Sequence, residues 1–207
     1  MRNKTAEPSP SALIESMRNL GYDLSSALAD IIDNSITAEA NEIRIDYGWN
    51  GAEPYVLILD NGNGMSEDQL LEAMTPGATS PLEDRELNDL GRFGLGLKTA
   101  SWSQCKRMSA YTKHDTSIHH LTWDLDHVSE VDDWELLGDL EQHEIDILNK
   151  KLKSEDSGTA ILWTNLDRIL PEKGDDETKK GHLYSIMVDL VTPYLSMIFQ
   201  LIWQITF

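Results

Sequence analysis

Apolar residues recur along this chain with two periods, one typical of helices and one typical of strands. In LADIIDNS (28–35), Leu28, Ile31 and Ile32 fall on one side of a helix, so their spacing predicts a helix over residues 23–36. Similar spacing, together with capping and stop residues, predicts further helices over residues 9–20, 66–74, 94–103, 139–153 and 180–199.

Strand patterns occupy the stretches between these helices. NEIRIDYGW (41–49) alternates, whereas YVLILD (55–60) and GTAILWTNL (158–166) are apolar runs typical of buried strands. Residues 107–137 also read as strands, divided into RMSAYTK, SIHHLTWDL and VDDWELL. This mixture predicts an α/β fold, a two-layer sandwich of a mixed, mostly antiparallel sheet with helices on one face. One domain over residues 1–207 is expected, because this length supports one sizeable core.

Composition and charge narrow the partners that we expect. The formal net charge is −19, so the general surface is not expected to bind nucleic acid or an anionic membrane. Cys105 is the only cysteine and the first ten residues lack an apolar segment, which favours a cytoplasmic protein over a secreted one. The apolar end YLSMIFQLIWQITF is shorter than the roughly 20 residues of a membrane span. We interpret it as a truncated core element, with an interfacial anchor as the alternative.

The predicted helix over residues 23–36 carries an acid and an amide as well as apolar residues. Ala27, Asp30 and Asn34 are spaced three and four apart, so they line one stripe of the helix. A carboxylate and a carboxamide one turn apart could hold a hydrated Mg²⁺ and orient a water molecule, because Mg²⁺ prefers oxygen ligands. The competing interpretation is an amphipathic helix with a solvated polar face.

A glycine-rich turn, DNGNGM (60–65), follows one of the buried strand patterns. Asp60 at the strand tip could accept a hydrogen bond from an exocyclic amine such as that of adenine, and the glycines permit close backbone approach. A simple turn is the alternative, since Asp-Asn-Gly is common in turns. An EF-hand calcium loop is excluded, because Gly62 and Leu71 stand where that motif needs an oxygen ligand and a glutamate.

A second glycine-rich motif, GRFGLGLKT (91–99), leads into a predicted helix. Free amides at a helix start, combined with glycines, form a cradle for anions. The motif is not a Walker loop, because a leucine separates Gly96 from Lys98, and Thr99 stands where a dinucleotide fingerprint needs its third glycine. The loop before it, residues 75–93, has no sustained period, so we expect it to be functional or mobile.

In this order and spacing, the motifs resemble those of the GHKL ATP-binding superfamily, which includes DNA gyrase B, a heat-shock chaperone, histidine kinases and the mismatch-repair protein MutL. Residues 29–35 resemble its asparagine box, residues 60–64 its first glycine box, residues 91–96 its second, and Gly158-Thr159 a late Gly-Thr pair. IIDNS and GLGLKTAS look most like MORC-type ATPases and their bacterial relatives. The resemblance implies the Bergerat ATP-binding fold, with ATP and Mg²⁺ as ligands.

The resemblance also implies roles for individual residues. Asn34 would coordinate Mg²⁺, Asp60 would hold the adenine amino group, and Thr159 would support that contact through a water. Asp30 would be the general base, but the family has glutamate there, and a reach shorter by roughly 1.5 Å can cost about 100-fold in rate. Lys98 would contact phosphate or remain solvated. The other implied nucleotide-binding residues are Gly62, Gly64 (which would give the base room), Met65, Gly94, Leu95, Gly96 and Thr99.

The function predicted on this basis is Mg-ATP binding with weak hydrolysis. Residues 75–96 would form a lid whose closure couples the nucleotide to a partner or to an ATP-dependent homodimer. One alternative is a nucleotide-gated binding module without turnover, favoured by the shortened acid and by the lack of a following domain that supplies a lysine. The other is a protein kinase of the same fold, but the six scattered histidines and short N-terminal stretch lack a phosphoacceptor hairpin.

Overall fold

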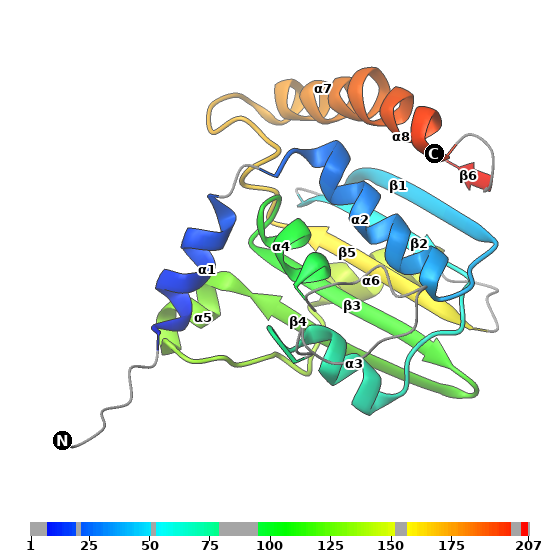
Figure 1. Cartoon of the computed structure of the whole chain (residues 1–207). Coiled ribbons are helices and arrows are strands. Elements are labelled where there is room, and N and C mark those ends of the chain that lie inside the picture. Colours follow the sequence, from blue (N-terminus) through cyan, green and yellow to red (C-terminus); the bar gives the residue numbers. More distant parts are fainter. Residues whose placement is uncertain are drawn as a thin grey trace.

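The computed structural model describes residues 8–19, 22–50, 53–78, 95–151, 157–199 and 204–206. The described strands form one sheet of order β4-β3-β5-β2-β1-β6 (Figure 1). Their bounds are β1 (Glu42–Asn50), β2 (Glu53–Asp60), β3 (Arg107–His114), β4 (Ser117–Asp124), β5 (Gly158–Thr164) and β6 (Gln204–Thr206). β1 pairs with β6 in parallel, and the other described pairings are antiparallel. The predicted mixed, mostly antiparallel sheet is therefore confirmed.

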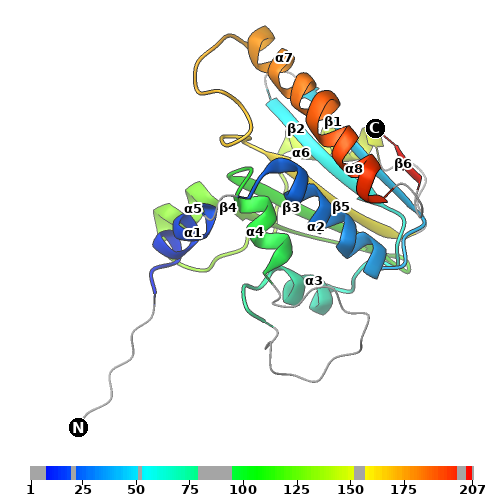
Figure 2. The same ribbon diagram turned by 45° about the horizontal axis from the view of Figure 1, so that its top comes forward.

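Most of the described helices cover one face of this sheet (Figure 2). Their bounds are α1 (Pro10–Arg18), α2 (Leu24–Thr37), α3 (Glu67–Met74), α4 (Gly96–Trp102), α5 (Leu125–Val131), α6 (Gln142–Lys151), α7 (Asp176–Ile186) and α8 (Thr192–Phe199). A π-helical turn, η1 (Met187–Val191), joins α7 to α8. α2 lies at the centre of this helical layer, where it contacts α4, α8 and β2.

Local sequence explains the two elements that frame the motifs. In α2 the stripe of Leu28, Ile31 and Ile32 is buried in the core, and the Asp23 side chain caps the helix start by accepting from the amide of Ser26. In β2 the alternate residues Val56 and Ile58 point into the same core. Since both elements bury an apolar side in one core, the polar residues at their ends are held at a fixed separation.

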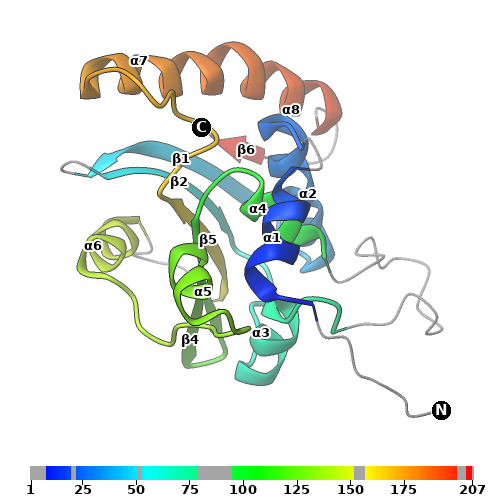
Figure 3. The ribbon, with the colours of Figure 1, turned by 90° about the vertical axis from the view of Figure 1, so that its left-hand side faces the viewer.

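One helix, α6, lies on the opposite face of the sheet (Figure 3). Ile147 and Leu148 from α6 join a second apolar cluster with Leu57, Leu59 and Leu162. The physical reason is that β2 is apolar at consecutive positions, so both of its sides need cover. The sandwich of sheet and helices is confirmed, but its helices are not confined to one face as expected.

The strand predicted for VDDWELL (131–137) is wrong. The Asp124 side chain accepts hydrogen bonds from the amides of Asp126 and His127 and so begins helix α5, which ends at Asp132 in a left-handed conformation. Of the residues that follow, Leu137 forms an isolated bridge with Thr122. A helix cap therefore interrupts a pattern that otherwise alternates like a strand.

The C-terminal helix combines buried and exposed apolar residues. Leu195 and Phe199 join the main core, whereas Leu190 and Met197 are exposed at 63% and 69%. By length and composition alone, Asp176–Phe199 is apolar enough to cross a membrane, a test that core helices also pass. The share of this helix window that is buried is 28%, so the truncated core element and the interfacial anchor both stay predictions.

Candidate functional site

Asp60 at the end of β2 is the centre of a hydrogen-bond network that joins three elements. Its Oδ1 accepts from the amides of Gly62 and Thr159 at 2.9 and 3.1 Å, and its Oδ2 accepts from the Ser35 hydroxyl of α2 at 2.9 Å. Burial raises the pKa of Asp60, although these three hydrogen bonds act in the opposite direction. The Asp60 carboxylate is therefore held in one orientation by hydrogen bonds from Gly62, Thr159 and Ser35.

These contacts leave Asp60 one site for a further donor. A carboxylate offers about four lone-pair positions, two on each oxygen. Both positions on Oδ1 are used by backbone amides, and one on Oδ2 is used by Ser35. The remaining position on Oδ2 suits one N–H or O–H donor, such as an exocyclic amine.

Thr159 lies directly opposite Asp60 in the ladder between β2 and β5. Its hydroxyl lies 3.3 Å from that of Thr112 on β3, and the Thr112 hydroxyl accepts from the amide of Met65 at 2.8 Å. The expected partner Thr159 is thus beside Asp60. Met65 is tied to the same end of the sheet through its backbone, while its side chain packs on the core.

The three glycines of this region are required by close backbone contacts. A Cβ on Gly62 would lie 2.6 Å from the carbonyl oxygen of Ala38, and a Cβ on Gly64 would lie 2.0 Å from that of Lys113. Gly64 and Gly158 also have positive φ angles of 67° and 140°. Glycine is therefore needed at position 64 because the backbone passes close to β3. Room for a base at this position stays a prediction.

On α2, Asp30 and Asn34 lie one turn apart near the same network. Asn34 is exposed and immediately precedes Ser35, whose hydroxyl bonds Asp60. Asp30 is half-buried, and its Oδ2 lies 3.9 Å from the position of a Cβ on Gly96, at the start of α4. The residues expected to read a base, hold a metal and activate water therefore lie on adjacent elements at one end of the sandwich.

Lys98 occupies a position that the sequence did not reveal. Its side chain is 2% exposed, and its ammonium donates to the carbonyl oxygens of Ala73 and Thr75 at 2.7 and 3.0 Å. Burial lowers the pKa of Lys98 to about 8, and the charge of Glu72 opposes this shift. The expectation of a solvated lysine is wrong. Here Lys98 ties α4 to the end of α3, and its contact with phosphate stays a prediction.

The remaining predicted residues lie at the start of α4 or outside the described part. Leu95 is the N-cap of α4, Gly96 is exposed at its first position, and the Thr99 hydroxyl donates to the carbonyl of Leu95 at 2.9 Å. Gly94 and most of the expected lid, residues 79–94, lie outside the described residues.

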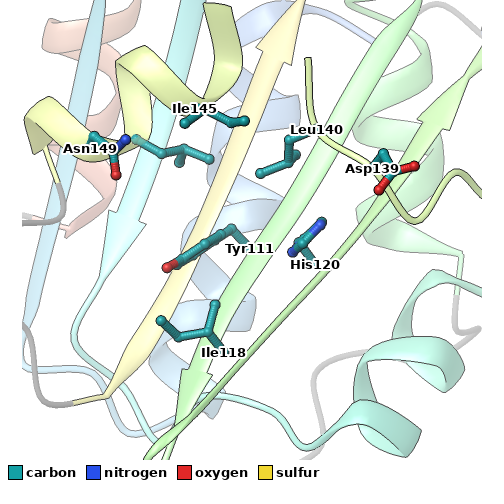
Figure 4. A pocket seen from close by; sticks show the side chains of 8 residues that line it. Tyr111, Ile118, His120, Asp139, Leu140, Ile145 and Asn149 are labelled. Atoms are coloured by element: carbon teal, nitrogen blue, oxygen red, sulfur yellow. The ribbon is translucent and has the colours of Figure 1, made fainter. Parts of the chain in front are cut away.

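Other features of the described residues do not coincide with these motifs. A hollow of about 550 Å³ lies between α6 and the β3–β4 hairpin (Figure 4), where it is lined by Tyr111, His120 and Ile145, among others. None of the predicted site residues lines it. Within the described ranges, no group of three His, Cys, Asp or Glu side chains is arranged to hold a metal ion.

Comparison with known proteins decides the family. The model of the histidine kinase-, DNA gyrase B-, and HSP90-like ATPases matches residues 22–159, which is more than half of the chain and includes both Tyr22 and Thr159. The chain belongs to this family of ATPases. The predicted GHKL membership is confirmed, and the matched segment contains each motif on which the prediction rested.

Relatives of this GHKL chain include a MORC ATPase and MutL proteins. It is 30% identical over 93 residues to ATPase morc-1 of Caenorhabditis elegans, which is 45% of this chain and 10% of that protein. It is 37% identical over 71 residues to DNA mismatch repair protein MutL of Thermosipho melanesiensis, covering 34% of this chain and 13% of that protein. The MutL of Thermotoga maritima is 34% identical over 94 residues, which cover 44% of this chain and 18% of that protein. The chain thus spans less than a fifth of each of these relatives.

Three residues of this candidate site in the GHKL chain were missed by sequence reasoning. Ser35 holds Asp60, Thr112 organises Thr159 and Met65, and the Tyr22 hydroxyl donates a hydrogen bond to Oδ2 of Asp30. Ser35 follows the asparagine directly and could have been inferred from helical spacing toward the core. Thr112 and Tyr22 carry no motif, so only the fold brings them to the site.

Proposed function

We propose that this domain binds Mg-ATP and hydrolyses it slowly. The single observation that carries the proposal is the hydrogen bond from Ser35 to Asp60, because it sets the base-reading carboxylate beside the helix that bears Asn34 and Asp30. The ATPase family of the chain supports a nucleotide as ligand. In this proposal the free position on Oδ2 of Asp60 accepts from the adenine amine, and Thr159 supports the contact through water.

Asn34 is the residue proposed to hold Mg²⁺. The amide oxygen of Asn34 is a hard ligand of the kind that Mg²⁺ prefers, so the donor chemistry fits the ion. Asn34 is exposed, and it directly precedes Ser35, which donates a hydrogen bond to Asp60. When bound, Mg²⁺ would neutralise charge on the phosphate oxygens. We place the phosphates toward Leu95, Gly96 and Thr99 at the start of α4, with Gly94 and Lys98 as further proposed contacts.

Asp30 is the proposed general base for hydrolysis. Its carboxylate lies beside Gly96, on the side of α2 that faces α4. There it would take a proton from a water molecule as the water oxygen bonds to the terminal phosphorus. The bond from that phosphorus to the bridging oxygen breaks, and the electron pair leaves with ADP. Aspartate is shorter than glutamate by one methylene, which is why we propose slow turnover.

Lid closure is the proposed link between nucleotide and partner. Lys98 fixes Thr75, the residue at which the proposed lid, 75–96, begins, so the base of that segment is tied to α4. Closure over ATP would present a new surface to a partner or to a second copy of this chain in the cytoplasm. The net charge of −19 argues against direct contact with nucleic acid.

Calorimetric titration with ATP, ADP and GTP, each with and without Mg²⁺, tests this function. We expect Mg-ATP to bind, and Asn34→Ala to weaken the Mg²⁺-dependent part of the affinity. Asp60→Asn is the sharpest variant, because the asparagine Oδ1 would still accept from the amides of Gly62 and Thr159. Its side-chain NH2 would donate to the Ser35 hydroxyl, and that hydroxyl can donate instead to the Ile31 carbonyl, which lies 3.3 Å away.

The fold should therefore survive Asp60→Asn, whereas affinity for ATP should fall about tenfold or more, since the acceptor for the amine is lost. Equal ATP affinity of wild type and Asp60→Asn would contradict the proposed base contact. Phosphate release by wild type and by Asp30→Asn tests hydrolysis separately, and equal rates would remove Asp30 from its proposed role.

A nucleotide-gated module without turnover is the second candidate. The observation that favours it is the aspartate at position 30, which is one methylene shorter than the glutamate that the family has there. In that case ATP and ADP would protect residues 75–96 from protease to different extents, while no phosphate would be released. Identical protection by both nucleotides would contradict gating.

A further inference from the structure

We propose that Tyr22 is a positioning residue that holds Asp30 in the orientation needed to activate water. The inference rests on the proposed function. It begins from the hydrogen bond between the Tyr22 hydroxyl and Oδ2 of Asp30, two residues that lie eight positions apart. Oδ2 is also the oxygen that lies 3.9 Å from the position of a Cβ on Gly96. The phenol takes one lone-pair position of this oxygen, so the held carboxylate keeps other positions to accept a proton from water.

The position of Tyr22 is itself fixed by the fold. Its carbonyl accepts a hydrogen bond of 2.9 Å from the side-chain amide of Gln104, which is 3% exposed and also bonds the Ser103 hydroxyl at 2.9 Å. Ser103 and Gln104 follow α4 directly, and Gly96 at the other end of α4 lies beside Asp30. Tyr22 thus connects the acid on α2 to the helix that begins at the second glycine motif.

The phenol is suited to this role because it acts as a donor throughout the neutral range. Burial, the hydrogen bond to Asp30 and the nearby charges of Asp30 and Asp23 raise the pKa of Tyr22 to about 12. The hydroxyl therefore keeps its proton and remains a donor to Asp30. A donor to one oxygen restricts the rotation of the short side chain, which otherwise samples orientations that miss the water.

This arrangement gives a reason for aspartate at position 30. A short carboxylate reaches less far than glutamate but has one fewer rotatable bond to fix. A single phenolic donor is then enough to hold it. The acid on α2 and the tyrosine that precedes this helix act as one unit, so the tyrosine should matter only while the acid is present.

Steady-state hydrolysis of Mg-ATP by Tyr22→Phe tests the inference. The variant keeps the ring and removes the hydroxyl, so we expect kcat to fall about tenfold while KM changes less than about twofold. Tyr184→Phe removes the hydroxyl of a tyrosine that is 63% exposed on α7, and this matched control should hydrolyse ATP like the wild type.

A double-mutant cycle separates positioning from a structural role. In an Asp30→Asn background, Tyr22→Phe should lower the residual rate no further, because there is no acid left to orient. If the fold depends on the hydroxyl instead, Tyr22→Phe lowers the rate equally in both backgrounds and weakens ATP binding, and the inference is overturned.

Failure of this inference can be told apart from failure of the proposed function. Hydrolysis by the wild type together with an unchanged kcat in Tyr22→Phe would overturn the role of Tyr22 and leave the ATPase intact. A wild type that binds Mg-ATP but releases no phosphate would overturn both, and that result is read from the wild type alone.

Discussion

Lys98 and Asp60 are buried charged residues that are held in different ways. Asp60 accepts three hydrogen bonds from groups fixed on other elements, whereas the Lys98 ammonium relies on two helix-end carbonyls, those of Ala73 and Thr75. Carbonyl dipoles compensate a buried cation only partly, which is why the pKa of Lys98 is lowered to about 8. Burying the charged Lys98 ammonium therefore lowers the free energy of unfolding by an amount that depends on pH.

We predict that the wild type gains stability relative to Lys98→Met as pH rises from 8 toward 10.5. Below pH 8 both the folded and the unfolded chain hold the proton on Lys98, so the cost of burying the charge is fully present. Above pH 8 the folded chain releases this proton before the unfolded chain does, and the free energy of unfolding rises by about 3 kcal/mol.

Urea unfolding of both proteins at several pH values between 7 and 10.5 measures this difference. Lys173→Met, which removes an exposed lysine, serves as the matched control. A difference between wild type and Lys98→Met that stays constant over this range would show that Lys98 is not held as a buried cation.

At the scale of single residues, sequence patterns pointed to candidate site residues more readily than to the residues that support them. Asp60, Asn34 and Thr159 could be chosen as candidates because they stand in motifs with fixed spacing, and their roles stay predictions. Tyr22 and Thr112 were missed because nothing local distinguishes them from ordinary loop and strand residues. Lys98 was expected to contact phosphate or to remain solvated, yet the C-terminal end of α3 supplies two carbonyls to its ammonium that only tertiary structure reveals.

Among the elements, the glycine turn after β2 depends on one close contact. Gly64 and Gly77 have almost the same φ, 67° and 68°, but their surroundings differ. A Cβ on Gly64 would lie 2.0 Å from the Lys113 carbonyl oxygen, whereas a Cβ on Gly77 would meet no atom within 4 Å. Alanine at Gly77 therefore tests backbone strain alone, whereas alanine at Gly64 adds a steric clash with β3.

We predict that Gly77→Ala lowers the free energy of unfolding by about 1–2 kcal/mol, the usual cost of a left-handed alanine. Gly64→Ala should cost clearly more and should also weaken ATP binding, because the turn after Asp60 must move away from β3. Chemical denaturation and nucleotide titration of the two variants measure both effects. Equal losses of stability in the two would show that the contact with Lys113 is not limiting.

Element positions were predictable wherever one period dominated the sequence. The apolar stripe of α2 and the continuous run of β2 have an unambiguous pattern, and both were confirmed. VDDWELL was misread because its alternation resembles that of a strand, whereas Val131 ends helix α5 and Asp132 caps that end in a left-handed conformation. The side of the sheet on which α6 lies was not predictable either, because its buried Glu144 looks like a surface residue in the sequence.

In the whole molecule, α6 is joined to the sheet by a buried ion pair as well as by apolar contacts. Glu144 is fully buried and accepts from the Arg107 guanidinium at 2.8 Å and from the Ser109 hydroxyl. Burial alone would raise the pKa of Glu144, but these hydrogen bonds and the charge of Arg107 lower it overall. The charged form is thus the one that binds α6 to β3.

We predict that Glu144→Gln lowers the free energy of unfolding by about 1.5–3 kcal/mol, because Arg107 loses one charged hydrogen-bond partner but keeps Asp124 at 2.7 Å. Hydrogen exchange should speed up across residues 142–151, while ATP affinity should stay within about twofold, since the nucleotide motifs lie at the end of β2 and on the other face. Glu130→Gln, an exposed change, is the matched control. A large loss of ATP affinity would show that the two faces are coupled.

The register of β2 and β5 has a further consequence for regulation. Asp60 and Thr159 face each other across one ladder, so their separation cannot change without breaking the sheet, whereas Asp30 is carried by a helix that rests on it. Under the proposed function, the sheet sets the Asp60–Thr159 pair that reads the base, and α2 carries Asp30, which sets the rate of ATP hydrolysis. A protein that pressed on this helix would adjust the speed of the cycle, and it would alter the choice of nucleotide only as far as it disturbed the hydrogen bond from Ser35 to Asp60.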